Sequence, residues 1–435
     1  MFRNAALFFA FTSVSILRGC AGEPSSSSAA PAPRTVASAP AAVAPAPASK
    51  QPSKHECDDR PPTLPPEPFT GGERAFATTR RALLDAYYAE GLTEDDLYRA
   101  AVAGMLEGVD PSMHRWNKLL SPREVAEIHS EIQGEIVGVG VMIAFSDETG
   151  RATVLGVVPG SPAERASLSS GDEIISVDGK LYRGKTAMDM SADIRGKAGD
   201  MVSLTVLRGD KLETVPIRRE AVALESVARA SLGEGIGYVH IWSFSDRTPT
   251  LLATALDALA ADGARSLVVD LRANGGGSFD GAVTSAGLML PEGAPVTTLE
   301  RRGGKVEPRV AKAGGKLLDI PMVVLVDHGT ASGGELVASA LVNGRKAQLV
   351  GRPTLGKWSV QTLDELGNGY AIKFTTSLFT AASGKLPPGT GLTPDVDVDE
   401  DEADMTRACA ITDATRRLAA DVQLRAAVAL LRARK

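Results

Sequence analysis

PMVVLVDHGTASGGELVASALVNGRKAQLVGRPTLGKWSVQ, residues 321–361, alternates short apolar runs with turns rich in glycine and polar residues. Its first apolar run, Met322–Val326, is typical of a fully buried strand. A polar turn leads to Ser332, and a helical pattern follows with its apolar residues on one face. A second short strand is expected at residues 347–350. This order predicts a β/α unit with a serine at the start of its helix.

The same alternation extends on both sides of this stretch. Strands are expected at residues 238–244, 266–271 and 370–380, and helices at residues 250–260 and 413–434. The phrase Arg272-Ala273-Asn274-Gly275-Gly276-Gly277 follows the second of these strands and enters a helix. The alternation predicts an α/β fold in which helices cover a sheet, over residues 223–435.

A different pattern occupies residues 135–222, where short β-type runs, the first over residues 136–145, are separated by glycine turns. This pattern predicts a small separate domain. In Val137-Gly138-Val139-Gly140-Val141, glycines flank an apolar residue before a strand, so backbone N–H groups can hold a carboxylate and the strand edge can bind an extended peptide. Together with Gly171-Asp172-Glu173-Ile174-Ile175 and Val177-Asp178-Gly179, the segment resembles a PDZ domain, which implies binding of protein C-termini.

The N-terminus has the pattern of an export signal. Arg3 precedes an apolar run over residues 5–17, which is too short to span a bilayer but suits a signal-peptide core. Leu17-Arg18-Gly19-Cys20 resembles a bacterial lipobox, which implies that residues 1–20 are a signal peptide and that Cys20 is lipidated at a membrane. A plain secretory signal is the alternative, and both interpretations predict export to the bacterial periplasm.

Two further segments precede the PDZ-like region. Residues 21–68 consist mostly of Ala, Pro and Ser, cannot bury a core and are predicted to be a disordered linker. Residues 69–134 have apolar residues at helical spacing. Within them, Ser121-Pro122-Arg123-Glu124 offers a serine cap, a proline at the first helical position and an acid in the first turn. An N-terminal helical region is therefore expected.

Composition limits the class of function. The 435 residues are 43% hydrophobic and 23% charged, which is typical of a soluble globular protein with two or three folded units. A net charge of −6 and the lack of a basic cluster argue against a nucleic-acid partner. Scattered histidines and no Cys-x-x-Cys motif give no metal-ligand spacing, so neither a metal nor a cofactor is expected. Cys57 and Cys409 can form a disulfide or stay unpaired.

Ser332, Lys357 and Gln361 have side chains that can form a catalytic group. A serine hydroxyl is a poor nucleophile until a base within hydrogen-bond reach takes its proton. Lysine can be that base only where desolvation lowers its pKa from about 10.4. A glutamine carbonyl can accept a hydrogen bond from the amine and orient it. Ser332 at a helix start also places the N–H of Gly333 near a developing oxyanion.

Other interpretations of these motifs stay open. Ser-x-x-Glu, from Ser332 to Glu335, is also a capping box, which would give the serine a structural role. Asp327 and His328 offer a Ser-His-Asp triad, although both precede the serine on the same turn. Residues 179–186 satisfy the GxxxxGK[ST] pattern of a nucleotide-binding P-loop, but a hairpin turn follows and the segment lies within the PDZ-like region.

The order of these motifs resembles the carboxyl-terminal processing proteases of the S41 serine peptidase family, from about residue 110 to the C-terminus. The resemblance implies a catalytic core similar to the crotonase and Clp protease folds. Thr330-Ala331-Ser332-Gly333-Gly334-Glu335 matches the family's nucleophile motif, and Gly356-Lys357-Trp358-Ser359-Val360-Gln361 matches its base motif. The roles implied are nucleophile for Ser332, base for Lys357, support for Gln361, and oxyanion donation by Gly333 and Gly276.

The resemblance further implies a serine endopeptidase that cleaves proteins or peptides near free C-termini, which the PDZ-like region recognises. A catalytically inactive peptide-binding scaffold is the alternative, because Gly333 and Gly334 stand where the family often has Ala and Ser, and Trp358 is bulky. Gly275 stands where the family usually has proline. Assembly into a homo-oligomer is left open.

Overall fold

The computed structural model describes residues 68–109, 114–146, 148–312, 314–387, 389–399 and 414–433. The chain forms two compact units, one over residues 14–86 and the other containing residues 87–435. Among the described residues, the first unit contributes the helix α1 (Gly72–Ala86), in which no side chain is buried. All elements below belong to the second unit.

Several expectations fall outside the described residues: the signal segment with Cys20, nearly all of the linker over residues 21–68, and both Cys57 and Cys409. In the part of the chain that the structure describes, no helix has the length and apolarity of a membrane span.

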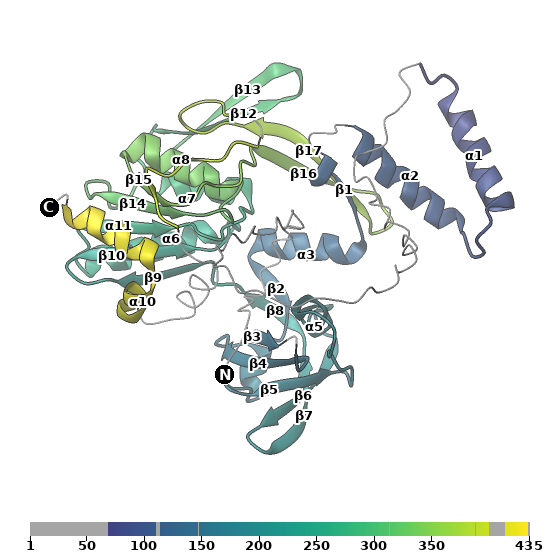
Figure 1. Ribbon diagram of the computed structural model, residues 1–435, viewed down its shortest axis with the longest axis horizontal. Coiled ribbons are helices and arrows are strands. Elements are labelled where there is room, and N and C mark those ends of the chain that lie inside the picture. Colours follow the sequence, from purple (N-terminus) through teal and green to yellow (C-terminus); the bar gives the residue numbers. More distant parts are fainter. Residues whose placement is uncertain are drawn as a thin grey trace, which may run out of the picture. The chain divides into compact units, whose positions relative to one another are not determined.

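A six-stranded sheet in the order β18–β15–β14–β11–β10–β9 forms the centre of the second unit (Figure 1). Its strands are β9 (Val227–Ser231), β10 (Ile236–Ile241), β11 (Ser266–Asp270), β14 (Met322–Val326), β15 (Gln348–Gly351) and β18 (Val396–Asp397). Neighbouring strands are parallel except for β9, which is antiparallel to β10. The strands β11 and β14 are buried throughout, and apolar except for Ser266 and Asp270 at the ends of β11, because helices cover both faces of the parallel part.

Each face of this sheet has its own apolar core. Val269 and Val324 pack on one face with α6 (Thr248–Ala261), α7 (Phe279–Gly287) and α8 (Gly333–Arg345). The residues just before them, Val268 and Val323, point the opposite way and pack on the other face with α11 (Val422–Ala433). Successive strand side chains point to opposite faces, so this alternation fixes the register of the sheet. The loops that leave β11 and β14 therefore start from fixed points.

A second, antiparallel sheet joins the N-terminal helical region to the peptidase-like region. Its strands are β1 (Lys118–Leu120), β12 (Pro295–Arg301), β13 (Lys305–Val310), β16 (Ser359–Glu365) and β17 (Ala371–Phe379). The elements that flank β1 are α2 (Glu94–Gly108), the short helix η1 (His114–Trp116) and α3 (Pro122–Gln133). As expected, Ser121 caps α3 and Pro122 occupies its first position. The pairing of Lys118 with Lys373 attaches η1 to the strands that follow Lys357.

A third sheet forms a compact module with its own apolar core, in the strand order β3–β4–β5–β6–β7. Its elements are β3 (Val141–Ser146), β4 (Arg151–Val157), α4 (Pro162–Arg165), β5 (Glu173–Val177), α5 (Ala187–Ile194), β6 (Met201–Arg208) and β7 (Lys211–Arg218). The strands β2 (Glu135–Gly138) and β8 (Glu220–Ala223) pair with each other. The strand β3 lies at the edge of the sheet and packs against α5, which leaves a strand edge beside a helix.

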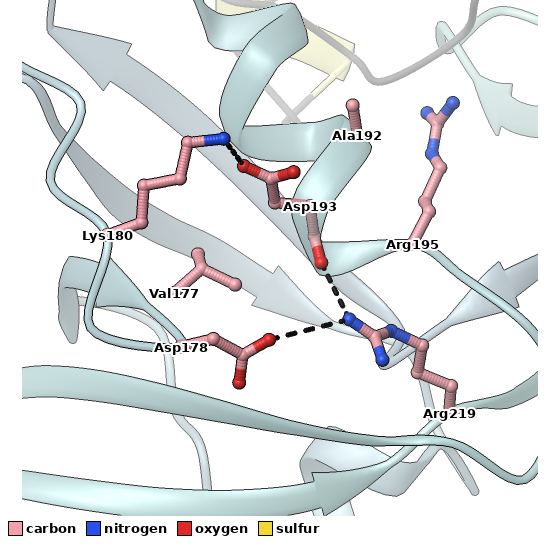
Figure 2. Close-up of a pocket in the computed structure, with 7 residues that line it drawn as sticks. All are labelled: Val177, Asp178, Lys180, Ala192, Asp193, Arg195 and Arg219. Atoms are coloured by element: carbon pink, nitrogen blue, oxygen red, sulfur yellow. Dashed lines mark hydrogen bonds and ion pairs between the residues drawn. The ribbon is translucent and has the colours of Figure 1, made fainter.

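The Arg219 guanidinium holds the C-terminal end of α5 (Figure 2). It donates to the backbone oxygens of Asp193 at 2.7 Å and Ile194 at 3.0 Å, which a helix end leaves without intrahelical partners. Asp178 and Lys180 help to line a cavity of about 330 Å³ beside it, where Lys180 pairs with the Asp193 carboxylate. Because these charged groups pair with one another, we assign this cavity a structural role in fixing α5.

Two expectations about secondary structure differ from the structure, and several strands were not expected. The strand expected at residues 136–145 is two strands, β2 and β3, because the chain turns at Gly140, which has φ +83°. The helix expected at residues 413–434 is divided into α10 (Ala414–Ala420) and α11 at Asp421, whose carboxylate caps α11 by accepting the N–H of Leu424 at 2.8 Å. The strands β12, β13 and β16 were not expected.

The P-loop interpretation also disagrees with the structure. Residues 179–186 and α5 connect β5 to β6, and these two strands are antiparallel neighbours. A P-loop helix instead follows a strand of a parallel sheet. Thr186 acts here as the cap of α5 by accepting the N–H of Asp189.

Candidate active site

Ser332 lies between β14 and α8 with a backbone conformation unlike that of the other caps. Its φ is 53° and its ψ is −113°, a combination that residues other than glycine rarely adopt. The caps of α2, α3, α4 and α5 have extended backbones with φ from −67° to −110°; they are Thr93, Ser121, Ser161 and Thr186. Strain of this kind persists only where surrounding contacts hold it, and it clusters at active sites.

The carboxylate of Glu335 connects Ser332 to the segment that contains Lys357. Its Oε2 accepts the backbone N–H groups of Ser332 and Lys357, each at 2.9 Å. Its Oε1 accepts the N–H of Gly356 at 2.6 Å and the hydroxyl of Thr354 at 2.5 Å. Burial raises the pKa of Glu335, while these hydrogen bonds act in the opposite direction. The bond from the Ser332 N–H to the Glu335 carboxylate is the acid's half of the expected capping box, and the same acid also fixes the backbone of the lysine.

Gly276 packs directly against Ser332. A Cβ at residue 276 would lie 2.8 Å from the Cβ of Ser332 and 3.0 Å from the backbone nitrogen of Gly333. Its φ of +105° also favours glycine. The glycine-rich phrase after β11 therefore lies beside the start of α8, where an oxyanion formed at Ser332 would need donors.

The two expected oxyanion donors differ in their present hydrogen bonding. Gly333 is the first residue of α8, and the first N–H groups of a helix have no intrahelical partner. The N–H of Gly276 donates to Oδ1 of Asn274 at 2.9 Å, so it must leave this bond before it can reach an oxyanion. Asn274, which the sequence did not single out, is buried and also accepts the N–H of Ala331 at its backbone oxygen. It thereby ties the two loops together.

Lys357 has the environment that a lysine base needs. Burial lowers its pKa to about 8, and the positive charges of Lys373 and Arg115 act in the same direction. The carboxylate of Glu335 opposes this shift. Near neutral pH a useful fraction of the amine is therefore unprotonated, which an exposed lysine could not provide.

The amine of Lys357 faces an aromatic ring. Its Nζ lies 4.8 Å from the centre of the Trp116 ring. Between the described residues, no hydrogen bond joins this amine to the hydroxyl of Ser332. The structure thus brings the backbones of the expected nucleophile and base together through Glu335, while their reactive atoms are not yet bonded.

Gln361 is held away from its expected partner. Its amide nitrogen donates to the hydroxyl of Ser359 at 2.9 Å and to that of Thr375 at 3.2 Å. The hydrogen bond to Lys357 that the resemblance implies is not formed in the described part of the chain, because β16 and β17 hold the amide.

Two other chemistries find no support among the described residues. The Asp327 carboxylate accepts hydrogen bonds from the backbone N–H groups of Ala273 and Thr330, at 2.9 and 3.0 Å. It therefore stabilises the loops around it. His328 is exposed, and its Nδ1 lies 3.0 Å from the backbone oxygen of Pro353. Neither completes a triad with the serine. In the same described ranges, no group of three or more His, Cys, Asp or Glu side chains is arranged to hold a metal ion.

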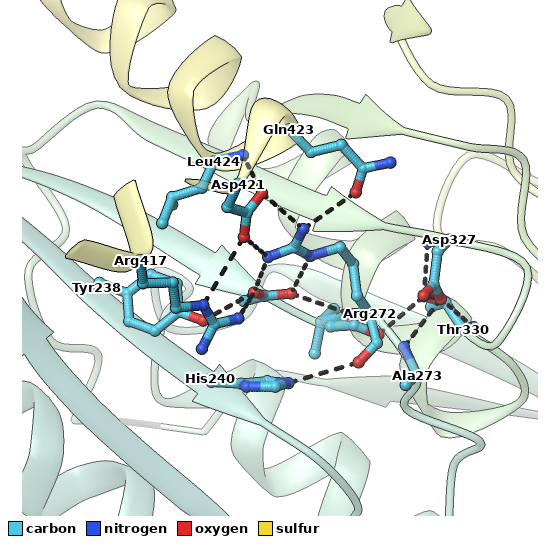
Figure 3. Close-up of polar contacts among 12 residues, drawn as sticks. Tyr238, His240, Arg272, Ala273, Asp327, Thr330, Arg417, Asp421, Gln423 and Leu424 are labelled. Atoms are coloured by element: carbon cyan, nitrogen blue, oxygen red, sulfur yellow. Dashed lines mark hydrogen bonds and ion pairs between the residues drawn. The ribbon is translucent and has the colours of Figure 1, made fainter. Parts of the chain in front are cut away.

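A buried network of charged side chains lies directly before the glycine-rich phrase (Figure 3). The Arg272 guanidinium lies 2.7 Å from Asp270 and from Asp421, and it donates to Gln423 at 3.1 Å. Burial alone would raise the pKa of the Asp270 carboxyl, but the facing guanidinium holds it well below its usual range. Because Asp421 and Gln423 lie at the start of α11, the network joins the C-terminal helices to the loop with Gly276.

Further side chains complete this network. The Tyr238 hydroxyl donates to Asp270 at 2.8 Å, and Arg417 of α10 lies 3.3 Å from the same carboxylate. Burial lowers the pKa of His240 to about 4, so its ring, 3.4 Å from the backbone oxygen of Arg272, is neutral at pH 7. Arg272 and Arg417 thus face the buried carboxylates of Asp270 and Asp421, and charges in such a setting need partners.

The helix-covered parallel sheet and the separate antiparallel module place the chain among α/β proteins with an attached small β domain. The sequence model of the PDZ domain matches residues 140–218, and that of peptidase family S41 matches residues 235–398. Residues 235–398 of this chain belong to peptidase family S41. The α/β peptidase core with a PDZ domain, expected from the sequence, is confirmed.

Individual relatives agree with this assignment. The chain is 31% identical over 310 residues to the carboxy-terminal processing protease CtpA of Bacillus subtilis, covering 71% of this chain and 65% of that protein. It is 32% identical over 321 residues to a probable CtpA-like serine protease of Staphylococcus aureus, covering 73% and 63%. The chain thus spans slightly less than two thirds of the length of these curated relatives. A solved structure of a putative S41 protease from Bacteroides fragilis has the same fold, with a TM-score of 0.53, 18% identity and coverage of 86% of this chain and 99% of that chain.

Proposed function

We propose that the protein is a serine endopeptidase of the carboxyl-terminal processing type, with Ser332 as nucleophile and Lys357 as general base. The observation that carries this proposal is the carboxylate of Glu335, which binds the backbone N–H of both residues. A shared acceptor holds the two segments at a fixed separation, which is the pre-organisation that catalysis requires. The lowered pKa of Lys357 and the strained backbone of Ser332 support the same roles.

The proposed reaction is acyl transfer. Neutral Lys357 takes the proton of the Ser332 hydroxyl as Oγ attacks the scissile carbonyl carbon, and the carbonyl electrons move to the oxygen. The oxyanion is stabilised by the N–H groups of Gly333 and Gly276. It then collapses, the C–N bond breaks, and Lys357 gives its proton to the leaving amine. Water attacks the resulting ester while Lys357 accepts a proton and returns it to Oγ, which releases the carboxylic acid.

Three local rearrangements are part of this proposal. The Lys357 amine has to move from the Trp116 ring to the hydroxyl, the N–H of Gly276 has to leave Asn274, and the Gln361 amide has to turn toward the amine. Each of these exchanges one polar contact for another. Catalytic hydrogen bonds of free enzymes often form only when substrate is bound.

The PDZ domain is proposed to bind the C-terminus of the substrate at the start of β3. An edge strand next to α5 can pair with an extended peptide. Before it, Gly140 has φ +83°, and a Cβ there would lie 2.3 Å from the Cβ of Ser161, so this turn needs glycine. The residues proposed to receive the carboxylate and the last substrate residues are Val137, Gly138, Val139, Gly140 and Val141.

Cleavage of an unfolded protein with an apolar C-terminal tail tests this function. With the purified full chain, Ser332→Ala and Lys357→Ala should each lower kcat/KM by about 100-fold or more. Amidation of the substrate C-terminus removes its carboxylate and should raise KM with little change in kcat. Wild-type rates for either variant would refute the Ser/Lys dyad, and an unchanged KM for the amidated substrate would refute the role of the PDZ domain.

A peptide-binding scaffold without catalysis is the second candidate function. It is favoured by the engagement of the Lys357 amine with Trp116 and of the Gly276 N–H with Asn274. In that case the wild type and Ser332→Ala would bind a tail peptide equally, and neither would cleave it. Covalent labelling of the wild type, but not of Ser332→Ala, by a fluorophosphonate would exclude the scaffold, since labelling requires an activated serine.

Export to the periplasm and lipidation at Cys20 are proposed from the sequence pattern of residues 1–20. The test is metabolic labelling with palmitate of the full chain in a bacterium that has a periplasm. The wild type should be labelled and Cys20→Ser should not. A soluble, unlabelled periplasmic protein would support the plain secretory signal instead.

A further inference from the structure

Trp116 is the aromatic residue that faces the proposed base. The Lys357 Nζ lies 4.8 Å from the centre of its ring, within the range of a cation–π interaction. The guanidinium of Arg115 also lies over this ring, at 4.7 Å. The indole is half-buried and comes from η1, which precedes the PDZ domain in the chain. A segment outside the matched peptidase region thus contacts the lysine.

The ring of Trp116 is held in place by its neighbours in the chain. The next residue, Asn117, accepts the backbone N–H of Thr375 at 3.0 Å and donates to the backbone oxygen of Leu106 at 3.3 Å. Directly after it, β1 pairs with β17. The indole is therefore anchored to the same strand that supports Gln361, so its contact with Lys357 does not depend on a free loop.

The charged groups around the Lys357 amine determine how strongly its ammonium form is favoured. Lys373 of β17 and Arg115 of η1 disfavour the ammonium form, and Glu335 of α8 favours it. The positive charge of Lys118 of β1 lowers the pKa of Lys373, and the carboxylates of Glu124 and Glu131 of α3 raise it. Against two nearby cations, the electron-rich face of an indole is a group that attracts an ammonium without a formal charge.

We propose that Trp116 is a positioning residue for Lys357, whose ammonium form it holds over its ring until the amine transfers to Ser332. This proposal rests on the proposed role of Lys357 as the base. The ring has two physical effects on the lysine. Its bulk excludes water, which any apolar side chain could do, and its π face attracts the charged form, which only an aromatic ring can do.

A matched pair of variants separates these two effects. Trp116→Phe and Trp116→Leu have similar volumes, but only phenylalanine keeps a π face. The readout is the pH dependence of fluorophosphonate acylation and of kcat/KM for a tail peptide, which should rise with pH as Lys357 loses its proton. Without the π face the ammonium is less favoured. The acid limb of Trp116→Leu should therefore lie about half a unit to one unit below that of Trp116→Phe.

The possible results are distinguishable. A merely structural role for Trp116 predicts lower rates with the same acid limb in both variants, and this outcome would overturn the proposal. Failure of the Ser/Lys assignment would appear separately, as undiminished acylation by Lys357→Ala. Thermal unfolding of each variant checks the fold, and Trp116→Met replaces Trp116→Leu as the variant without a π face if the latter does not fold.

Discussion

At the scale of single residues, the proposed site depends on a contact between Gly276 and Ser332 that leaves no space for another carbon atom. The serine has a strained backbone, and the glycine has a φ that only glycine adopts easily. Two unusual conformations in direct contact show that the loops after β11 and β14 fit each other closely. Such a fit is expected where a nucleophile and an oxyanion site must have a fixed separation.

Gly276→Ala should therefore abolish most of the activity. The new Cβ, 2.8 Å from the Cβ of Ser332, would displace the serine or the donor loop. We expect fluorophosphonate acylation to fall by about 100-fold or more, as when an oxyanion donor is lost. Gly303→Ala is the matched control, because Gly303 also has a positive φ but a Cβ there meets nothing within 4 Å. Equal activity of the two variants would contradict this account of the contact.

At the scale of elements, the start of α8 and the segment before β16 are joined by one buried carboxylate. Each oxygen of Glu335 accepts from two donors. In Glu335→Gln the amide NH₂ must face one of these pairs. Because the Thr354 hydroxyl can also accept, this leaves without an acceptor either the N–H of Gly356 or the N–H groups of Ser332 and Lys357. We expect a loss of about 2–5 kcal/mol in the free energy of unfolding, and an acylation rate well below that of the wild type.

Urea unfolding and fluorophosphonate labelling measure these two effects of Glu335→Gln. Thr354→Val is its comparison. It removes the Thr354 hydroxyl, which donates to Glu335 and accepts the N–H of Leu392, and it leaves the carboxylate bonded to Ser332 and Lys357. It should cost about 1–3 kcal/mol, because the N–H of Leu392 loses its acceptor, and keep most of the acylation rate. If Glu335→Gln is as stable and as reactive as the wild type, the shared carboxylate does not position the nucleophile and the base.

Local patterns in the sequence predict much of this part of the fold. Contacts between segments that are far apart in the chain cannot be predicted from these patterns. Met322–Val326 is a strand as expected because a buried parallel strand is apolar throughout. Ser-x-x-Glu predicts the bond from Ser332 to Glu335, but nothing local shows that the same carboxylate also binds Lys357. The contact between Trp116 and Lys357 joins segments far apart in the chain, so spacing cannot reveal it. β13 was not expected, since a polar edge strand has a weak pattern.

At the scale of the whole second unit, the C-terminal helices are linked by buried charges to the loop with Gly276, the proposed oxyanion donor. Asp421 interrupts the helical pattern between α10 and α11, and its carboxylate lies 2.7 Å from the guanidinium of Arg272. Arg272 is followed by the loop that ends at Gly276. The break between the helices is therefore the feature that brings a negative charge to the start of the loop that leads to Gly276.

Asp421→Asn should destabilise the protein and lower its activity together. The substitution nearly preserves volume but removes a buried negative charge that lies 2.7 Å from Arg272 and 3.7 Å from Arg417. Breaking a buried pair in this way costs about 3–5 kcal/mol, and the loss of this partner of Arg272 should shift the loop that leads to Gly276. Glu234→Gln is the control, because Glu234 pairs with Arg432 of α11 at the surface, where a pair contributes about 0–1 kcal/mol. Urea unfolding and peptide cleavage, measured on both variants, should separate them. A fully active Asp421→Asn protein would show that the C-terminal helices do not position the catalytic loop.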